Sequence, residues 1–375
     1  MKLVLAGGGT GGHVFPAIAL AKKWLEVDDD VIYIGGTNSL EEKIANKEGI
    51  SFYSIPVKPL PRKLSVDLFI SIVSNINAVI KARKILKKEA PDIVVGTGGY
   101  VSGATISAAR LLNIKTLIHE QNSVPGLANR ISARFVDKIA LSYKESADYF
   151  KSKEEKLVLT GNPVRKKLLE VNLQEARDYL GIPNNKKVLL VMGGSQGAAS
   201  INQLMLAIYD DLIKINNLTI IHITGADDFN KVKTKIDSYK DINQKVIISP
   251  FINNIEYPLA AADLIISRAG AVTLAEITAL GLPAILIPYP YATNNHQYKN
   301  AEVLERLGAA LIYEDNSLNS KEILSKLKDL LNNDYMLSEM SKISKSIGKP
   351  EALNKIYNLT YKMAQKKSTY NKEKV

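Results

Sequence analysis

Glycine-rich segments with polar side chains beside them occur twice in this sequence, each after a short apolar run. Residues 7–12 are GGGTGG and His13 follows them, and residues 193–197 are GGSQG. Bare backbone amides at the start of a helix can bind an anion or approach a sugar closely, because the helix dipole is positive there. Both segments therefore predict a site for phosphate or sugar groups. Tight glycine turns that only serve close packing are the alternative.

His13 is the candidate general base of the first segment. The positive end of a helix favours the neutral imidazole, which can accept a proton from a substrate. A histidine that merely caps the helix is the alternative interpretation.

A third polar segment, SRAGAVTLAE at residues 267–276, also stands between an apolar run and a predicted helix. A loop that leads into a helix start can hold a phosphate, and Glu276, one turn further on, can hold ribose hydroxyls. Downstream, Asn294, Asn295, His296 and Gln297 form a polar stretch.

Several common nucleotide and metal sites are disfavoured. Residues 7–12 fit the pattern GxGxxG, but residues 32–36, IYIGG, lack the acid that an NAD site places at the end of its second strand. His13-Val14 stands where a Walker A motif needs Lys-Ser/Thr. The acidic run at residues 28–30 precedes a predicted strand and is expected to be a solvated loop, and the four histidines show no ligand spacing. We expect neither a metal nor a cofactor.

The elements that must position these residues follow a βαβ pattern. Ten short, β-branched apolar runs predict strands buried on both faces, with helical patterns between most of them. These runs are residues 3–6, 31–34, 93–95, 116–118, 138–141, 188–192, 219–223, 246–248, 264–266 and 284–287. The α/β class is therefore expected, with parallel sheets.

The opening of strand, glycine loop and helix occurs twice, which predicts two Rossmann-like domains facing across a cleft. The predicted domains are residues 1–161 and 162–348. A helix at about 350–365 is expected to pack back on the first domain, and residues 366–375 to form a basic, flexible tail.

A chain of 375 residues without cysteine suits two domains in a reducing compartment. Its net charge of +11 is concentrated, since residues 58–88 contain eight basic side chains and one acid. Residues 64–80 within this segment also have a broad apolar face. This segment is interpreted either as an ordinary core helix or as a patch that meets an anionic membrane surface. A surface that binds nucleic acid is disfavoured, because its basic charge would be more widely spread.

Six motifs, in order and with fitting spacing, resemble the MurG family of bacterial glycosyltransferases (GT-B fold, family 28). They are GGTGGH at residues 8–13, GTGGYVSG at 96–103, HEQN at 119–122, GNPVR at 161–165, GGSQG at 193–197 and HQ at 296–297. The resemblance extends over about residues 1–360. It implies inverting, metal-independent transfer of N-acetylglucosamine (GlcNAc) from UDP-GlcNAc to the 4-hydroxyl of lipid I, forming lipid II. It also implies a peripheral protein at the cytoplasmic face of the bacterial cell membrane.

The resemblance further implies roles for individual residues. His13 would activate the acceptor hydroxyl, with Glu120 as a helper. Ile252 would contact uracil and Glu276 the ribose. The residues expected to bind the donor are Thr10, Gly11, Gly12, Asn122, Arg165, Ser195, Ile252, Ala271, Val272, Thr273, Glu276 and Gln297.

One feature departs from the family pattern, and one other enzyme class stays open. Asn294-Asn295 stands where the family usually has an acid, which puts a charge-dependent role there in doubt. A UDP-GlcNAc 2-epimerase shares the fold and the donor and is the alternative function. The basic, apolar 58–88 segment argues against it.

Overall fold

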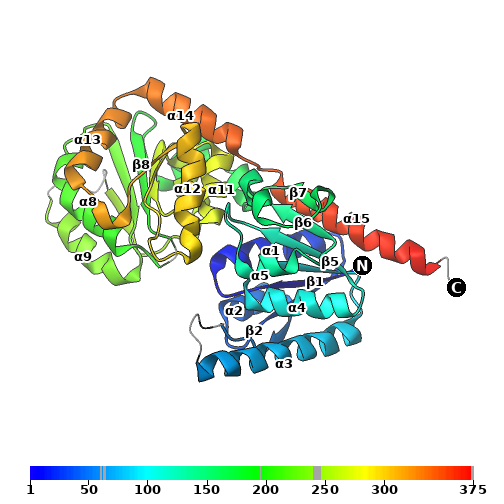
Figure 1. Ribbon diagram of the computed structural model, residues 1–375. Helices are drawn as coiled ribbons and strands as arrows, with labels where there is room; N and C mark the ends of the chain where they lie inside the picture. The colour runs from blue at the N-terminus through cyan, green and yellow to red at the C-terminus, as the bar shows by residue number, and fades with distance from the viewer. Residues whose placement is uncertain (60, 62–64, 195, 240–245, 373–375) are drawn as a thin grey trace. The chain divides into compact units, whose positions relative to one another are not determined.

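The computed structural model describes residues 1–59, 61, 65–194, 196–239 and 246–372, with side chains to residue 365. The chain forms two units. The N-terminal unit comprises Met1–Pro163 and Glu351–Val375, and the C-terminal unit comprises Val164–Pro350. Each unit is built on one parallel sheet (Figure 1).

The N-terminal unit has a seven-stranded sheet in the order β3-β2-β1-β4-β5-β6-β7. Its strands are β1 (Lys2–Gly7), β2 (Asp30–Gly36), β3 (Ser51–Ile55), β4 (Ile93–Gly98), β5 (Lys115–Glu120), β6 (Lys138–Leu141) and β7 (Leu157–Leu159). Its helices are α1 (Gly11–Leu25), α2 (Leu40–Lys47), α3 (Val66–Glu89), α4 (Gly99–Leu111), α5 (Leu127–Ser132) and α15 (Ala352–Lys372), with short 3₁₀ turns at Lys144–Tyr149 and Glu154–Lys156.

The C-terminal unit has a six-stranded sheet in the order β10-β9-β8-β11-β12-β13. Its strands are β8 (Lys187–Met192), β9 (Leu218–Ile223), β10 (Val246–Ser249), β11 (Leu264–Ser267), β12 (Ala284–Leu286) and β13 (Ala310–Ile312). Its helices are α6 (Lys166–Glu170), α7 (Leu173–Leu180), α8 (Ala199–Leu212), α9 (Ala226–Asp237), α10 (Glu256–Ala261), α11 (Ala271–Leu280), α12 (His296–Leu307), α13 (Ser320–Leu331) and α14 (Asp334–Ile347), with 3₁₀ turns at Thr293–Asn295 (η3) and Asp315–Ser317 (η4).

Both faces of each sheet are covered, which explains the unbroken apolar runs. In β1, Leu3 and Leu5 join one core cluster, while Val4 and Ala6 join the cluster on the opposite face. The first cluster includes Trp24, whose indole nitrogen donates to Thr360 Oγ1 of α15 at 3.2 Å. Helix α15 thus completes the core of the N-terminal unit, and it continues to Lys372, into the segment expected to be a tail.

The ten predicted strands are all present, but three further strands were not predicted. These are β3, β7 and β13, and each lies at the edge of its sheet. Strand β7 is partly exposed along its whole length, and β3 is buried only at Ile55. An edge strand does not need the continuous apolar run that marks a central strand, so its sequence signal is weaker.

The two sheets repeat one strand order, with the first strand of each unit third from one edge. Parallel strands bring all their carboxyl ends to one edge of a sheet, and α/β proteins bind ligands at that edge. The glycine segments follow β1, β4 and β8, and the 267–276 segment follows β11. The fold therefore places the candidate groups of each unit along one edge.

Candidate active site

His13 is held at the start of α1 by the glycine segment before it. Its ring nitrogen Nδ1 lies 2.9 Å from the carbonyl oxygen of Gly8. A carbonyl can only accept, so Nδ1 carries the hydrogen, and the neutral ring presents Nε2 as a proton acceptor. The tautomer needed by a general base is thus set by a backbone contact.

A further glycine-rich segment, GTGG at residues 96–99, lies at the end of β4 and packs directly against this imidazole. Gly98 has a φ of +118°, and a Cβ atom there would lie 2.7 Å from His13 Cδ2. Only glycine fits, because any side chain would collide with the ring and would be strained by the backbone. The Thr97 hydroxyl also donates to the His13 carbonyl oxygen at 2.7 Å. The 7–12 and 96–99 segments therefore form one structural group around His13.

Glu120, at the end of β5, is buried and surrounded by donors. Its Oε1 accepts from the backbone and side-chain nitrogens of Asn122 at 3.0 and 3.2 Å. Its Oε2 accepts from the Gly126 backbone nitrogen at 3.1 Å and from Asn129 Nδ2 at 2.8 Å. A carboxylate engaged in this way holds the 121–126 loop in place. The geometry favours a positioning role over direct proton transfer.

His119 and Gln121 tie this loop to the glycine segments. Gln121 Nε2 lies 2.8 Å from the Thr97 carbonyl oxygen and 3.1 Å from His119 Nδ1. His119 Nε2 in turn contacts the Gly161 carbonyl oxygen at 3.0 Å. Burial lowers the pKa of His119 to about 4, so its ring stays neutral at physiological pH. The N-terminal unit thus brings Glu120 and Asn122 to the same edge as Thr10, Gly11, Gly12 and His13.

The helices that begin beside the glycine and 267–276 segments have no side-chain cap at their first turn. Within the described residues, α1, α4, α8 and α11 have no side-chain cap, as is also true of α5, α6, α9, α10 and α12, whereas α2, α3, α7, α13 and α14 are capped by a serine or asparagine. Uncapped amides of the first turn need another partner, and an anion is the most favourable one. In α11 these amides belong to Ala271, Val272 and Thr273, three of the expected donor-binding residues.

The GGSQG segment of the C-terminal unit packs beside a group of buried, hydrogen-bonded polar residues. A Cβ atom at Gly197 would lie 2.2 Å from the carbonyl oxygen of Thr224, so the segment can approach β9 only with glycine there. Asn202 Nδ2 donates to that same carbonyl at 2.8 Å, and its Oδ1 lies 2.9 Å from His222 Nε2. Burial lowers the pKa of His222 to about 3, which keeps this ring neutral as well. Ser195 of the segment lies outside the described residues.

Arg165 and Glu276 form an ion pair, with Arg165 Nε 2.8 Å from Glu276 Oε1. The glutamate is only 2% exposed, while the arginine side chain is 51% exposed. Burial raises the pKa of Glu276, and the neighbouring guanidinium opposes this effect. The pair places two expected donor-binding residues in direct contact, one anchored in the core and one facing solvent.

Ile252 and Gln297 lie in separate segments of the same unit. Ile252 is half-buried after β10, next to the exposed Phe251. Gln297, in the first turn of α12, accepts a hydrogen bond through Oε1 from the Tyr289 backbone nitrogen at 2.9 Å. Its oxygen is therefore used within the protein, and its NH₂ group is the part that can reach a ligand.

Comparison with known proteins places this geometry in a family. Residues 3–141 match the glycosyltransferase family 28 N-terminal domain, and residues 188–356 match the family 28 C-terminal domain. The UDP-N-acetylglucosamine–N-acetylmuramyl-(pentapeptide) pyrophosphoryl-undecaprenol N-acetylglucosamine transferase of Halothermothrix orenii is 47% identical over 96% of this chain and 98% of its own length. The chain belongs to glycosyltransferase family 28.

Further relatives agree with this assignment. The transferase of the same name from Halalkalibacterium halodurans is 41% identical over 97% of the chain and all of its own length. The crystal structure of Acinetobacter baumannii MurG matches with a TM-score of 0.77 and 29% identity, over 96% of this chain and 99% of that one. The predicted GT-B fold and the resemblance to the MurG family are confirmed. A UDP-GlcNAc 2-epimerase from Neisseria meningitidis, with a TM-score of 0.68 over 96% of this chain and all of its own, is only 14% identical and shares the fold alone.

Two features of this family 28 glycosyltransferase were not predicted from its sequence. Arg268 lies within the SRAGAVTLAE segment, yet no role was inferred for it; in the structure its guanidinium is buried and contacts several loops. The Asn202–His222 contact was also missed, because the two residues come from different elements, α8 and β9. A polar residue inside the apolar run 219–223 was the available signal for a buried partner.

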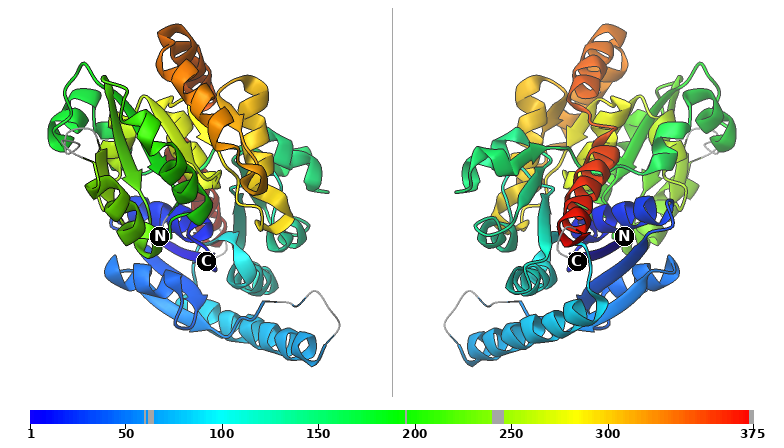
Figure 2. Two further views of the ribbon diagram at one scale, coloured as in Figure 1. Left: turned by 90° about the vertical axis from the view of Figure 1, so that its left-hand side faces the viewer. Right: turned by 90° about the vertical axis from the view of Figure 1, so that its right-hand side faces the viewer.

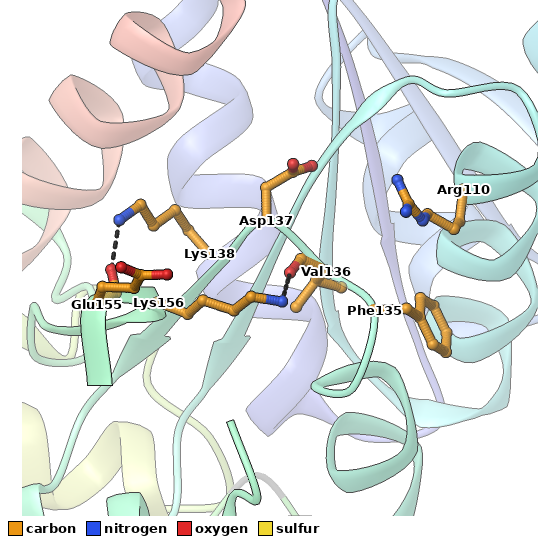
Figure 3. A pocket seen from close by; sticks show the side chains of 7 residues that line it. All are labelled: Arg110, Phe135, Val136, Asp137, Lys138, Glu155 and Lys156. Carbon is orange, nitrogen blue, oxygen red and sulfur yellow. Dashed lines mark hydrogen bonds between the residues drawn. The ribbon is translucent and has the colours of Figure 1, made fainter. Parts of the chain in front are cut away.

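A hollow on the N-terminal unit lies away from these groups. It is lined by Arg110, Phe135, Val136, Asp137, Lys138, Glu155 and Lys156 (Figure 3). Lys138 begins β6, so the hollow lies at the amino ends of the strands, opposite the glycine segments. The Lys138 and Lys156 amines are bound to the backbone carbonyls of Glu155 and Val136. The described residues contain no cluster of three or more His, Asp or Glu side chains placed to hold a metal ion.

Proposed function

We propose that the enzyme transfers GlcNAc from UDP-GlcNAc to the 4-hydroxyl of the MurNAc-pentapeptide of lipid I, forming lipid II in peptidoglycan synthesis. Relatives that cover nearly the whole chain are transferases named for this reaction. The geometric observation that carries the proposal is His13, whose Nδ1 is fixed on the Gly8 carbonyl oxygen, which leaves Nε2 as the proton acceptor of the ring.

The acceptor half of the reaction belongs to the N-terminal unit. His13 Nε2 removes the proton from the acceptor hydroxyl as that oxygen attacks the anomeric carbon of GlcNAc. The bond from this carbon to the UDP oxygen breaks, and its electron pair leaves with UDP. Attack on the face opposite UDP inverts the anomeric configuration. Glu120 supports this step by holding the loop that carries Asn122.

The donor half belongs to the C-terminal unit. Negative charge grows on the diphosphate as the bond to the sugar breaks. The uncapped starts of α8 and α11 present amides to that charge, and Arg165 adds a guanidinium. Glu276 binds the ribose hydroxyls, Ile252 contacts uracil, and the Gln297 amide contacts the sugar. Thr10, Gly11, Gly12 and Asn122 bind the sugar and its diphosphate end, and Ser195 completes the diphosphate contacts.

Transfer of radiolabelled GlcNAc to a lipid I analogue tests this function. We expect labelled disaccharide product at the same rate with and without EDTA, because protein groups stabilise the leaving diphosphate. Absence of transfer would refute the function, and loss of transfer on adding EDTA would refute the metal-independent part.

Helix α3 supports peripheral attachment at the cytoplasmic face of the membrane. It lies along the outside of the N-terminal unit, beside α4 (Figure 2). Residues 66–80 of this helix expose seven large apolar side chains, so an ordinary core helix does not describe this part. They are Val66, Phe69, Ile70, Ile72, Val73, Ile76 and Ile80.

Exposed lysines and an arginine follow these apolar side chains, between residues 81 and 88 of α3. Apolar side chains beside basic ones suit an anionic lipid surface. The described residues include no helix that is long and apolar enough to cross a membrane.

Liposome flotation tests this attachment. Changing Phe69 and Ile76 to serine is expected to abolish binding to vesicles that contain anionic lipid, while transfer to a water-soluble acceptor is retained. Changing Lys81 and Lys84 to glutamine is expected to weaken binding and make the remainder less sensitive to salt. Unchanged binding in both variants would remove α3 from the membrane contact.

A further inference from the structure

Arg268 follows β11 in the C-terminal unit, and its guanidinium is almost fully withdrawn from solvent. The side chain is 12% exposed. Its Nη1 donates to the backbone carbonyl oxygens of Ile287 and Pro288, at 3.0 and 3.2 Å. Both carbonyls belong to the segment that leaves β12. Arg268 therefore fixes the path of a neighbouring loop rather than facing a ligand.

The same guanidinium also holds the start of α8. Its Nη2 donates to the Ser200 hydroxyl at 3.0 Å, and Ser200 is the second residue of that helix. The Ser200 hydroxyl donates in turn to Asp315, which forms an ion pair with Arg268. Asp315 is also nearly buried, so the charge of the guanidinium is balanced where water is scarce.

A further contact extends this group to Gln297. The Arg268 guanidinium lies 5.6 Å from the centre of the Tyr289 ring. The Tyr289 backbone nitrogen donates to Gln297 Oε1, which fixes the direction of the Gln297 amide. A continuous chain of contacts thus leads from Ser200 through Arg268 and the 287–289 segment to Gln297.

We propose that Arg268 is a positioning residue that couples the two halves of the donor site. In the sheet, β8, β11, β12 and β13 are neighbours, and Arg268 joins the segments that follow all four of them. It thereby sets the α8 start, which faces the diphosphate, and the Gln297 amide, which faces the sugar, in one arrangement. The coupling rests on the proposed function of this unit as the donor site.

Arginine suits this role for a chemical reason. Its planar fork carries several donors at fixed angles, so one side chain can bind two carbonyls, a hydroxyl and a carboxylate together. Lysine keeps the charge but offers one compact ammonium group, so it cannot span both loops. Arg268→Lys therefore removes the coupling with little change in charge, and Asp315→Asn weakens it from the other side with little change in shape.

The test is a double-mutant cycle. Arg268→Lys, Gln297→Ala and the double variant are compared with the wild-type enzyme for the dissociation constants of UDP-GlcNAc and UDP. Arg177→Lys is the matched control: it is also a buried guanidinium of this unit, bound to Asp263 and the Asn184 carbonyl. Asp315→Asn replaces Arg268→Lys in the cycle if the lysine variant is unstable.

We expect Gln297→Ala to weaken UDP-GlcNAc binding roughly tenfold in the wild-type background and by less than about twofold in the Arg268→Lys background, because independent sites would give equal factors. UDP, which lacks the sugar, should not respond to Gln297→Ala in either background. Equal losses of UDP-GlcNAc affinity in both backgrounds would overturn the coupling.

Hydrogen exchange of the ligand-free protein separates this proposal from the proposed function. Arg268→Lys is expected to speed exchange in residues 287–298 and in the first turns of α8 together, while Arg177→Lys leaves both protected. Faster exchange in only one of the two segments would overturn the coupling. A wild-type enzyme that does not bind UDP-GlcNAc would instead refute the proposed function, and the exchange result would still decide whether Arg268 couples the loops.

Discussion

The two units share one strand order but secure their functional loops with opposite charges. In the N-terminal unit, Glu120 at the end of β5 accepts hydrogen bonds from backbone and side-chain nitrogens of the 121–129 segment. In the C-terminal unit, Arg268 at the end of β11 donates to backbone carbonyls after β12. The Glu120 carboxylate thus accepts from N–H groups in the N-terminal unit, and the Arg268 guanidinium donates to C=O groups in the C-terminal unit.

This difference fits the work proposed for each unit. In the C-terminal unit, the uncapped starts of α8 and α11 supply N–H groups for a diphosphate. A loop held through its N–H groups has fewer donors left for an anion. That arrangement suits the unit whose task is to accept a proton at His13. The same scaffold is thus specialised through one buried charge in each unit.

Removing His13 gives the largest expected effect, because it is the only group assigned to proton transfer. His13→Ala should lower kcat by roughly 10²–10⁴-fold, the usual contribution of a general base. The dissociation constant of UDP should stay within about threefold, because the substitution leaves the contacts within the C-terminal unit unchanged. Lys22→Ala, at an exposed position of the same helix, is the control for α1. Unchanged turnover would remove His13 as the base.

Glu120 should affect acceptor use more than donor binding. Glu120→Ala leaves several buried donors of its loop without a partner, at a cost of about 1–3 kcal/mol. We expect kcat/KM for the acceptor to fall by roughly 10–100-fold while UDP affinity is retained. Glu120→Gln keeps one acceptor oxygen and should have a smaller effect. A direct catalytic role would be indicated instead if Glu120→Gln were as inactive as His13→Ala.

The buried histidines predict a smaller effect, on stability rather than activity. His119 and His222, one in each unit, have pKa values lowered to about 4 and about 3, against 6.5 when unfolded. Below pH 6.5 the unfolded chain binds protons that the native state does not, so stability is complete above this pH and falls as the pH decreases. For each histidine, the free energy of unfolding should decrease by about 2 kcal/mol when the pH is lowered from 7 to 5.

Calorimetric Tm values at pH 7 and pH 5 check this dependence. His222→Gln should reduce the difference between the two Tm values, because glutamine does not titrate. A difference that is the same in the variant and the wild-type enzyme would show that His222 does not contribute to it.

Much of the fold could be predicted from sequence because the central strands are buried on both faces. The runs 3–6 and 188–192 are unbroken for this reason, and they locate the glycine segments at the strand ends. The edge strands β3, β7 and β13 lacked that signal. For α3, one apolar periodicity suits both a core helix and a surface patch, and only the packing shows that Phe69 and Ile76 are exposed.

The contacts that position the candidate site residues could not be predicted from the sequence. Asp315 and Ser200 are 47 and 68 residues from Arg268, and only the strand order and register bring them together. The Gly8 carbonyl that fixes His13 is five residues away, but its direction depends on the local backbone path. The residue types indicated which reactions the side chains can support. The packing of the loops that follow the strands determined which side chains contact one another.

Ligand mapping by hydrogen exchange tests the division of labour between the units most directly. UDP alone should protect the first turns of α8 and α11 more than residues 8–13, which contact only its diphosphate end. A soluble lipid I analogue alone should protect residues 8–13 and 96–101 and leave α8 and α11 unchanged. Protection of residues 8–13 by UDP, with α8 and α11 unaffected, would contradict the assignment of donor and acceptor to these units.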